Sequence, residues 1–116
     1  MNQVILTGRL AKEPELHYSK DGIGVTSFHL AVKRNYKSSD GTYEADFVPC
    51  VSFRKNAENI ASYCDKGTLV ALSGRLQTRS YENKDNIKIY VTEVVVDSIE
   101  FLQRRRSEAK KEKVLA

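Results

Sequence analysis

Four side chains at every second position of one segment are able to bind a common ligand: Arg75, Gln77, Arg79 and Tyr81. In a β-strand, alternate side chains point to the same face, so this segment would project two guanidinium groups, an amide and a phenol ring from one surface. Cations bind phosphates, and an aromatic ring stacks on any base. The pattern favours a flexible single-stranded nucleic acid as the ligand, although an isolated polar row of this kind is also typical of a solvated strand.

Two further segments combine rings with cations in the same way. One holds Lys33, Arg34, Tyr36 and Lys37, and the other holds Phe47, Phe53, Arg54 and Lys55. Phe47 and Phe53 also share strand parity with Val51, which would place both rings in an ordinary core row. Periodicity alone favours the core for these two, unless a bulge at Pro49 changes the face of either ring.

Residue types that support catalysis or metal binding are present, but without the partners that such sites need. They are Cys50, Cys64, His17, His29, Glu44 and Asp46. The cysteines lack paired zinc spacing and are interpreted as small buried hydrophobes, and the histidines as surface polar groups. The two carboxylates share a face, but no nucleophile, general acid or phosphate loop accompanies them, so a solvated hairpin is expected. The sequence predicts a protein that is not an enzyme and needs no cofactor or metal.

The length of 116 residues and the apolar share of 41% fit one globular domain. The net charge of +4 is concentrated in residues 103–116, because the positive and negative charges of residues 1–102 balance. We therefore expect a folded domain over residues 1–103 and a short, flexible basic tail over residues 104–116. No apolar run reaches the ~18 residues of a membrane span and no signal peptide is recognisable, which predicts a cytoplasmic protein.

The predicted elements are three strands, one helix and two strands. They cover residues 4–10, 25–36, 43–54, 56–64 (the helix), 68–81 and 87–102. Asn56 is the expected helix N-cap, and Gly8 and Gly74 are the expected points where strands bend. Five bent strands with one short helix between the third and fourth indicate an all-β, five-stranded OB-fold barrel, with a Greek-key sandwich as the alternative.

Five short motifs, in order and at family spacing, resemble the bacterial single-stranded DNA-binding protein family from residue 2 to about residue 102. They are VILTGRL at residues 4–10 with Pro14-Glu15, LAV at 30–32, YCDKG at 63–67, GRLQTR at 74–79 and YVTEVVV at 90–96. The resemblance implies an OB-fold domain that forms a homotetramer and wraps single-stranded DNA. Residues 2–10 are the expected pairing element between chains.

The resemblance also implies roles for particular side chains. The stacking rings map onto Tyr36, Phe47, Phe53 and Tyr81, and the phosphate-binding cations onto Lys55, Lys66 and Arg79. In well-studied members three of the ring positions are tryptophan, which this chain lacks. Position alone adds further candidate cations: Arg9, Lys33, Arg34, Lys37, Arg54, Arg75, Lys84 and Lys88.

Typical members of the family end in a long linker and an acidic tip that recruits replication and repair enzymes. This chain ends after a basic stretch and resembles the shorter paralogues linked to competence or mobile elements, or a trimmed chain, so recruitment through a tip is not expected. The function predicted is sequence-tolerant binding and protection of single-stranded DNA in replication, recombination, repair or DNA uptake. The alternative is a protein-interaction accessory of replication restart with secondary DNA contact, whereas a nuclease lacks the clustered carboxylates that divalent metals need.

Overall fold

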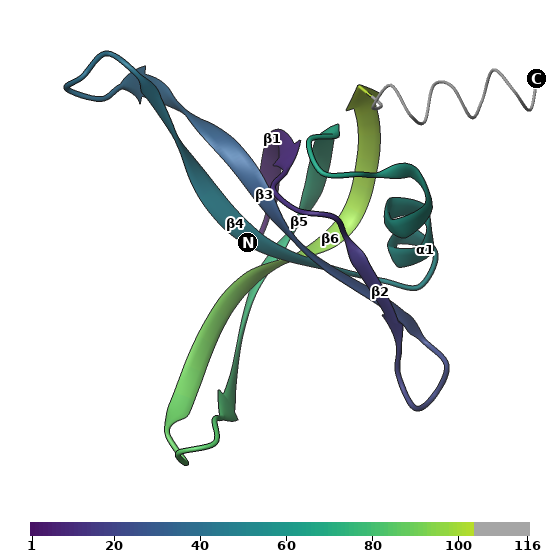
Figure 1. Ribbon diagram of the computed structural model, residues 1–116. Helices are drawn as coiled ribbons and strands as arrows, with labels where there is room; N and C mark the ends of the chain where they lie inside the picture. The colour runs from purple at the N-terminus through teal and green to yellow at the C-terminus, as the bar shows by residue number, and fades with distance from the viewer. Residues whose placement is uncertain (104–116) are drawn as a thin grey trace, which may run out of the picture.

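A computed structural model of the protein describes residues 1–103 as six strands and one helix (Figure 1). The elements are β1 (Val4–Leu10), β2 (Glu15–Tyr18), β3 (Gly24–Lys37), β4 (Tyr43–Phe53), α1 (Arg54–Tyr63), β5 (Leu69–Glu82) and β6 (Lys88–Gln103). Alternation of side chains produces the first half of β3, where Thr26, Phe28 and Leu30 are buried and Ser27 and His29 are exposed. The tail expected over residues 104–116 lies outside the described residues.

The strands form a closed barrel rather than two packed sheets. The sheet order is β1-β5-β6-β4-β3-β2, and β1 pairs with β5 along Val4–Arg9 and then with β3 through Arg9 and Leu10. β2 is a short additional strand on the free edge of β3. The helix lies between β4 and β5, which correspond to the third and fourth predicted strands. The OB-fold class is therefore confirmed, and the sandwich alternative is wrong.

The core fills the barrel, and α1 packs against it with Ala57 and Ile60. Its largest buried side chains include Leu10, Leu30 and Val70 from three different strands. The two cysteines are free and buried in the same core, as the sequence predicted. No helix of residues 1–103 is long and apolar enough to cross a membrane.

Two glycines that were predicted as bend points lie where another strand's backbone approaches closely. A Cβ at Gly8 would lie 2.4 Å from the carbonyl oxygen of Ala31, and a Cβ at Gly74 would lie 2.0 Å from that of Val95. The β5–β6 register also shifts between Ser73 and Gly74. At both positions a backbone carbonyl occupies the space that a side chain needs, so barrel closure requires glycine there.

Two local predictions need correction. Phe53, the last residue of β4, occupies the N-cap position, and its side chain has no group that could cap the helix. The chain turns into α1 at Arg54, which has a φ of 60°. Asn56 therefore lies inside the helix, where its side-chain amide donates a hydrogen bond to the Asp97 carbonyl at 3.1 Å. The β3–β4 register runs through Pro49 without a bulge, and the irregularity lies between Lys33 and Lys37.

Candidate nucleic-acid interface

The four rings singled out in the sequence are all exposed. The exposed fractions are 59% for Tyr36, 63% for Phe47, 40% for Phe53 and 49% for Tyr81. The core interpretation of Phe47 and Phe53 is therefore wrong, even though Val51 of the same strand is buried. Exposed rings of this size are available for stacking on bases.

Phe47 belongs to a row of side chains that crosses three strands. It lies opposite Ala31 of β3, which in turn lies opposite Arg9 of β1. Its ring lines a shallow depression together with Lys12 and His29. This outer surface of the barrel thus combines an apolar ring with the Lys12 ammonium, which suits one base and its phosphate.

The predicted side chains lie in one row on β5, beside a carboxylate of β6 that sequence reasoning missed. Glu93 of β6 lies opposite Gln77, and its Oε1 accepts hydrogen bonds from Gln77 Nε2 at 2.9 Å and Arg79 Nε at 2.8 Å. The Arg79 guanidinium carbon lies 6.0 Å from the centroid of the Tyr81 ring. Because Glu93 binds through the Arg79 Nε atom, it fixes the side chain while the guanidinium remains half exposed beside the ring.

Arg79 is expected to contribute to stability as well as to ligand binding. The Glu93 side chain is 8% exposed and the Arg79 side chain 54%. In Arg79→Ala, the buried carboxylate keeps only Gln77, which should cost about 1–3 kcal/mol of unfolding free energy. The salt dependence of binding should also fall by about one charge. Denaturant unfolding and binding at several salt concentrations measure the two effects.

Arg75→Ala is the matched control, because Arg75 lies in the same row and forms no ion pair with residues 1–103. It should lower the salt dependence of binding without lowering the unfolding free energy. An unchanged unfolding free energy in Arg79→Ala would show that Gln77 alone satisfies Glu93.

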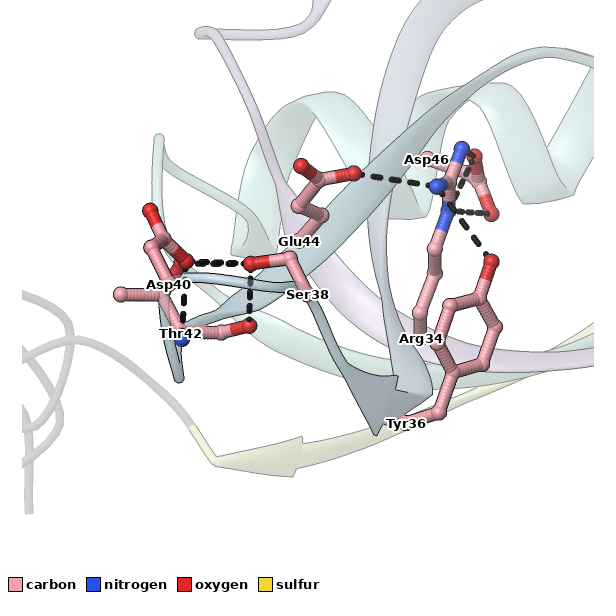
Figure 2. A network of polar contacts seen from close by, with 7 residues as sticks. All are labelled: Arg34, Tyr36, Ser38, Asp40, Thr42, Glu44 and Asp46. Atoms are coloured by element: carbon pink, nitrogen blue, oxygen red, sulfur yellow. Dashed lines mark hydrogen bonds and ion pairs between the residues drawn. The ribbon is translucent and has the colours of Figure 1, made fainter.

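Arg34 differs from the other candidate cations because it forms ion pairs with two carboxylates of the protein (Figure 2). Its Nη2 donates to Asp46 Oδ1 at 2.8 Å, and its Nε donates to Asp46 Oδ1 at 3.1 Å and Oδ2 at 3.2 Å. Its Nη1 donates to Glu44 Oε2 at 3.0 Å. Hydrogen bonds from Arg34 lower the pKa of the Asp46 carboxyl, and those to Asp46 raise the pKa of Arg34 above its ordinary value. The carboxylate pair noted in the sequence thus balances Arg34, whose role in the structure is to link β3 to β4.

The hairpin formed by β3 and β4 separates two residues that are neighbours in the sequence. Lys33 lies opposite Ala45, on the face that carries Phe47. Arg34 and Tyr36 lie on the other face, where the Tyr36 hydroxyl is 3.4 Å from Arg34 Nη1. The cluster predicted around Tyr36 is therefore divided between the two faces of the hairpin.

The remaining predicted cations lie around the barrel. Arg9 donates from Nη1 to the Gly67 carbonyl and from Nη2 to Gln103 Oε1, both at 2.9 Å, which joins β1 to the end of β6. Lys66 donates its backbone N–H to Glu13 at 3.0 Å. Arg54 and Lys55 begin α1 beside Phe53, and Lys84 lies in the turn between β5 and β6. These positions do not converge on one point.

Two exposed tyrosines with cations above their rings were not among the predicted site residues. Lys33 Nζ lies 4.1 Å from the centroid of the Tyr43 ring, and Lys88 Nζ lies 5.4 Å from that of Tyr90. The strand parity that Tyr43 shares with Phe47 could have indicated that both rings lie on the same face of β4. Residues 1–103 contain no group of three His, Cys, Asp or Glu side chains that could hold a metal ion.

A closed OB barrel that displays rings and cations on its strands belongs to the class of single-strand nucleic-acid-binding modules. The family model described as "Single-strand binding protein family" matches residues 1–102. The chain belongs to this family.

Curated relatives agree with the family match. The chain is 50% identical over 107 residues to single-stranded DNA-binding protein B of Bacillus subtilis, covering 92% of this chain and 95% of the relative. It is 50% identical over 107 residues to the single-stranded DNA-binding protein of Staphylococcus aureus, covering 92% of this chain and 69% of the relative. It is 51% identical over 105 residues to the single-stranded DNA-binding protein of Bacillus cereus, covering 90% of this chain and 62% of the relative. The chain thus spans nearly all of the first relative and less than two thirds of the third.

Proposed function

We propose that this protein binds and protects single-stranded DNA with little sequence preference. The observation that carries the proposal is the exposure of Phe47 beside Lys12 and of Tyr81 beside Arg79 on the outer surface of the barrel. Rings stack on bases of any sequence, and cations neutralise the phosphates between them. The names of the relatives, all single-stranded DNA-binding proteins, support the same ligand.

In this proposal binding acts by mass action and needs no catalytic group, cofactor or metal. The rings are Tyr36, Phe47, Phe53 and Tyr81, and the cations are Arg9, Lys33, Lys37, Arg54, Lys55, Lys66, Arg75, Arg79, Lys84 and Lys88. Because stacking requires an unpaired base, binding draws hairpins and duplex ends toward the single-stranded form. This activity would serve replication, recombination, repair or DNA uptake.

The proposal includes assembly of several copies of the chain, with a homotetramer as the expected form. β1 pairs with β5 along Val4–Arg9, but with β3 only at Arg9 and Leu10. The other edge of Val4–Gly8 is therefore unpaired within the described residues, and Ile5 beside it is exposed. A second copy of the chain could continue the sheet at this edge.

Titration with poly(dT) at two salt concentrations tests the proposal, with the mass of the complex measured by light scattering. Binding should be stoichiometric at low salt, weaken as salt is added, and exceed the affinity for duplex DNA of the same length. Affinity that is equal for duplex, or independent of salt, would contradict the mechanism. If the purified chain does not bind oligo(dT) at all, the alternative of a protein-interaction module replaces it.

A further inference from the structure

Tyr43, the first residue of β4, carries two lysines above its ring. Lys33 Nζ lies 4.1 Å and Lys37 Nζ 5.8 Å from the ring centroid, and the side chain is 48% exposed. Both distances are within the range of a cation–π contact. A half-exposed ring with two cations beside it provides the stacking surface and the positive charges that a nucleotide binds.

The ring of Tyr43 continues the surface that begins at Phe47. The two residues are four positions apart in β4, so they share a face at a separation of about 13 Å. Lys33 lies opposite Ala45, halfway between them. Beside Ala45 the surface is hollowed over β1 and β3, with Gly8, Ala45 and Lys33 in its lining. A strand of DNA that stacks on Phe47 would therefore pass Lys33 before it reaches Tyr43.

The turn before Tyr43 is held in one conformation (Figure 2). Asp40 accepts hydrogen bonds from the Ser38 hydroxyl and from the Thr42 backbone N–H and hydroxyl, and these bonds lower the Asp40 pKa to about 2. The Ser38 N–H donates to the Thr42 carbonyl at 2.7 Å, and Gly41 has a φ of 85°, which glycine adopts without strain. The turn thus presents Tyr43 in a fixed position at neutral pH.

The charge on this face of the hairpin is positive. The acidic residues of β4, Glu44 and Asp46, are bound to Arg34 on the opposite face. Neither Lys33 nor Lys37 forms an ion pair with residues 1–103. The two lysines are therefore available to phosphates.

We propose that Tyr43 is an additional nucleotide-binding residue, with a base stacking on its ring and the flanking phosphates bound by Lys33 and Lys37. A cation–π contact at an exposed site is weaker than base stacking on the same ring. When DNA binds, the lysines therefore leave the Tyr43 ring and bind phosphates, and a base stacks on the ring instead. This inference rests on the proposed function and extends its surface from Phe47 toward the end of the β3–β4 hairpin.

The test compares Tyr43→Leu with Tyr81→Leu and Tyr18→Leu in titrations with oligo(dT). Tyr18 is the matched control, because its ring is exposed on β2, away from this hairpin (Figure 1). Tyr43→Leu should weaken binding about tenfold without changing the salt dependence, and Tyr43→Phe should restore binding. Tyr18→Leu should match the unmodified chain.

Fluorescence provides a direct signal of stacking, since the chain has six tyrosines and no tryptophan. DNA should quench a smaller share of the emission in Tyr43→Phe than in Tyr18→Phe. Affinity of Tyr43→Leu within twofold of the unmodified chain, while Tyr81→Leu weakens it, would overturn this inference and leave the proposed function intact. If the unmodified chain does not bind oligo(dT), both fail together.

Discussion

Gly74→Ala should lower the free energy of unfolding by about 3 kcal/mol, the upper end of the usual cost of overpacking. The added Cβ would lie 2.0 Å from the Val95 carbonyl oxygen and 2.9 Å from its carbon, and neither is a flexible side-chain end that could move aside. Strand β5 or β6 must shift to accept it, and overpacking against a rigid neighbour has this cost. Denaturant unfolding followed by circular dichroism measures the change.

Gly24→Ala is the control for this substitution. Its Cβ would have ordinary contacts, the nearest at 3.5 Å to the Tyr18 ring, and Gly24 also lies in a strand without a positive φ. Its unfolding free energy should stay within about 1 kcal/mol of the unmodified chain. Equal losses in the two variants would mean that β5 and β6 separate easily at Gly74, so that the close crossing is not required.

Combined replacement of Phe47 and Tyr81 by alanine should cause the largest loss of DNA binding. Each exposed ring should contribute about 1–3 kcal/mol through stacking, so the double variant should lose roughly the sum. Because neither side chain is charged, the salt dependence of binding should stay unchanged. Oligo(dT) titrations at three salt concentrations separate the two quantities.

Tyr18→Ala serves as the comparison, since it removes an equally exposed ring from β2. It should bind like the unmodified chain. Loss of only a few tenths of a kcal/mol in the Phe47/Tyr81 double variant would show that binding depends on the cations alone. The unfolding free energy of both variants should be nearly unchanged, because exposed rings contribute little to the core.

The regular features of the fold were predictable from local patterns. Alternation in residues 25–36 and 68–81 defined the strands. Gly8 and Gly74 were predicted as bend points, and the structure adds that a backbone carbonyl approaches each of them closely. The start of α1 was not predictable in this way. Arg54 has a positive φ directly after the strand that ends at Phe53, and no capping residue in the sequence marks this helix start.

The faces of the side chains depended on long-range pairing, which local periodicity does not contain. Phe47 and Val51 have the same parity, but the barrel core contains Cys50 and Val48 of the other parity, so both lie on the outer face of β4. Only Val51 is buried there, where it pairs with Val95 of β6. The sequence offers Arg34 and Lys33 as equal candidates for phosphate binding. Only the β3–β4 register shows that Asp46 and Glu44 lie beside Arg34. The partnership of Glu93 with Arg79 likewise appears only when β6 is aligned with β5.

The seam where β1 meets β3 consists of only two residue pairs, Arg9 with Ala31 and Leu10 with Leu30. The row from Arg9 through Ala31 to Phe47 crosses this seam, so it exists only while the barrel is shut. A ligand that contacts both Arg9 and Phe47 would bridge the seam between β1 and β3. DNA bound across this seam would raise the melting temperature of the protein, as expected for any ligand that binds only the native state.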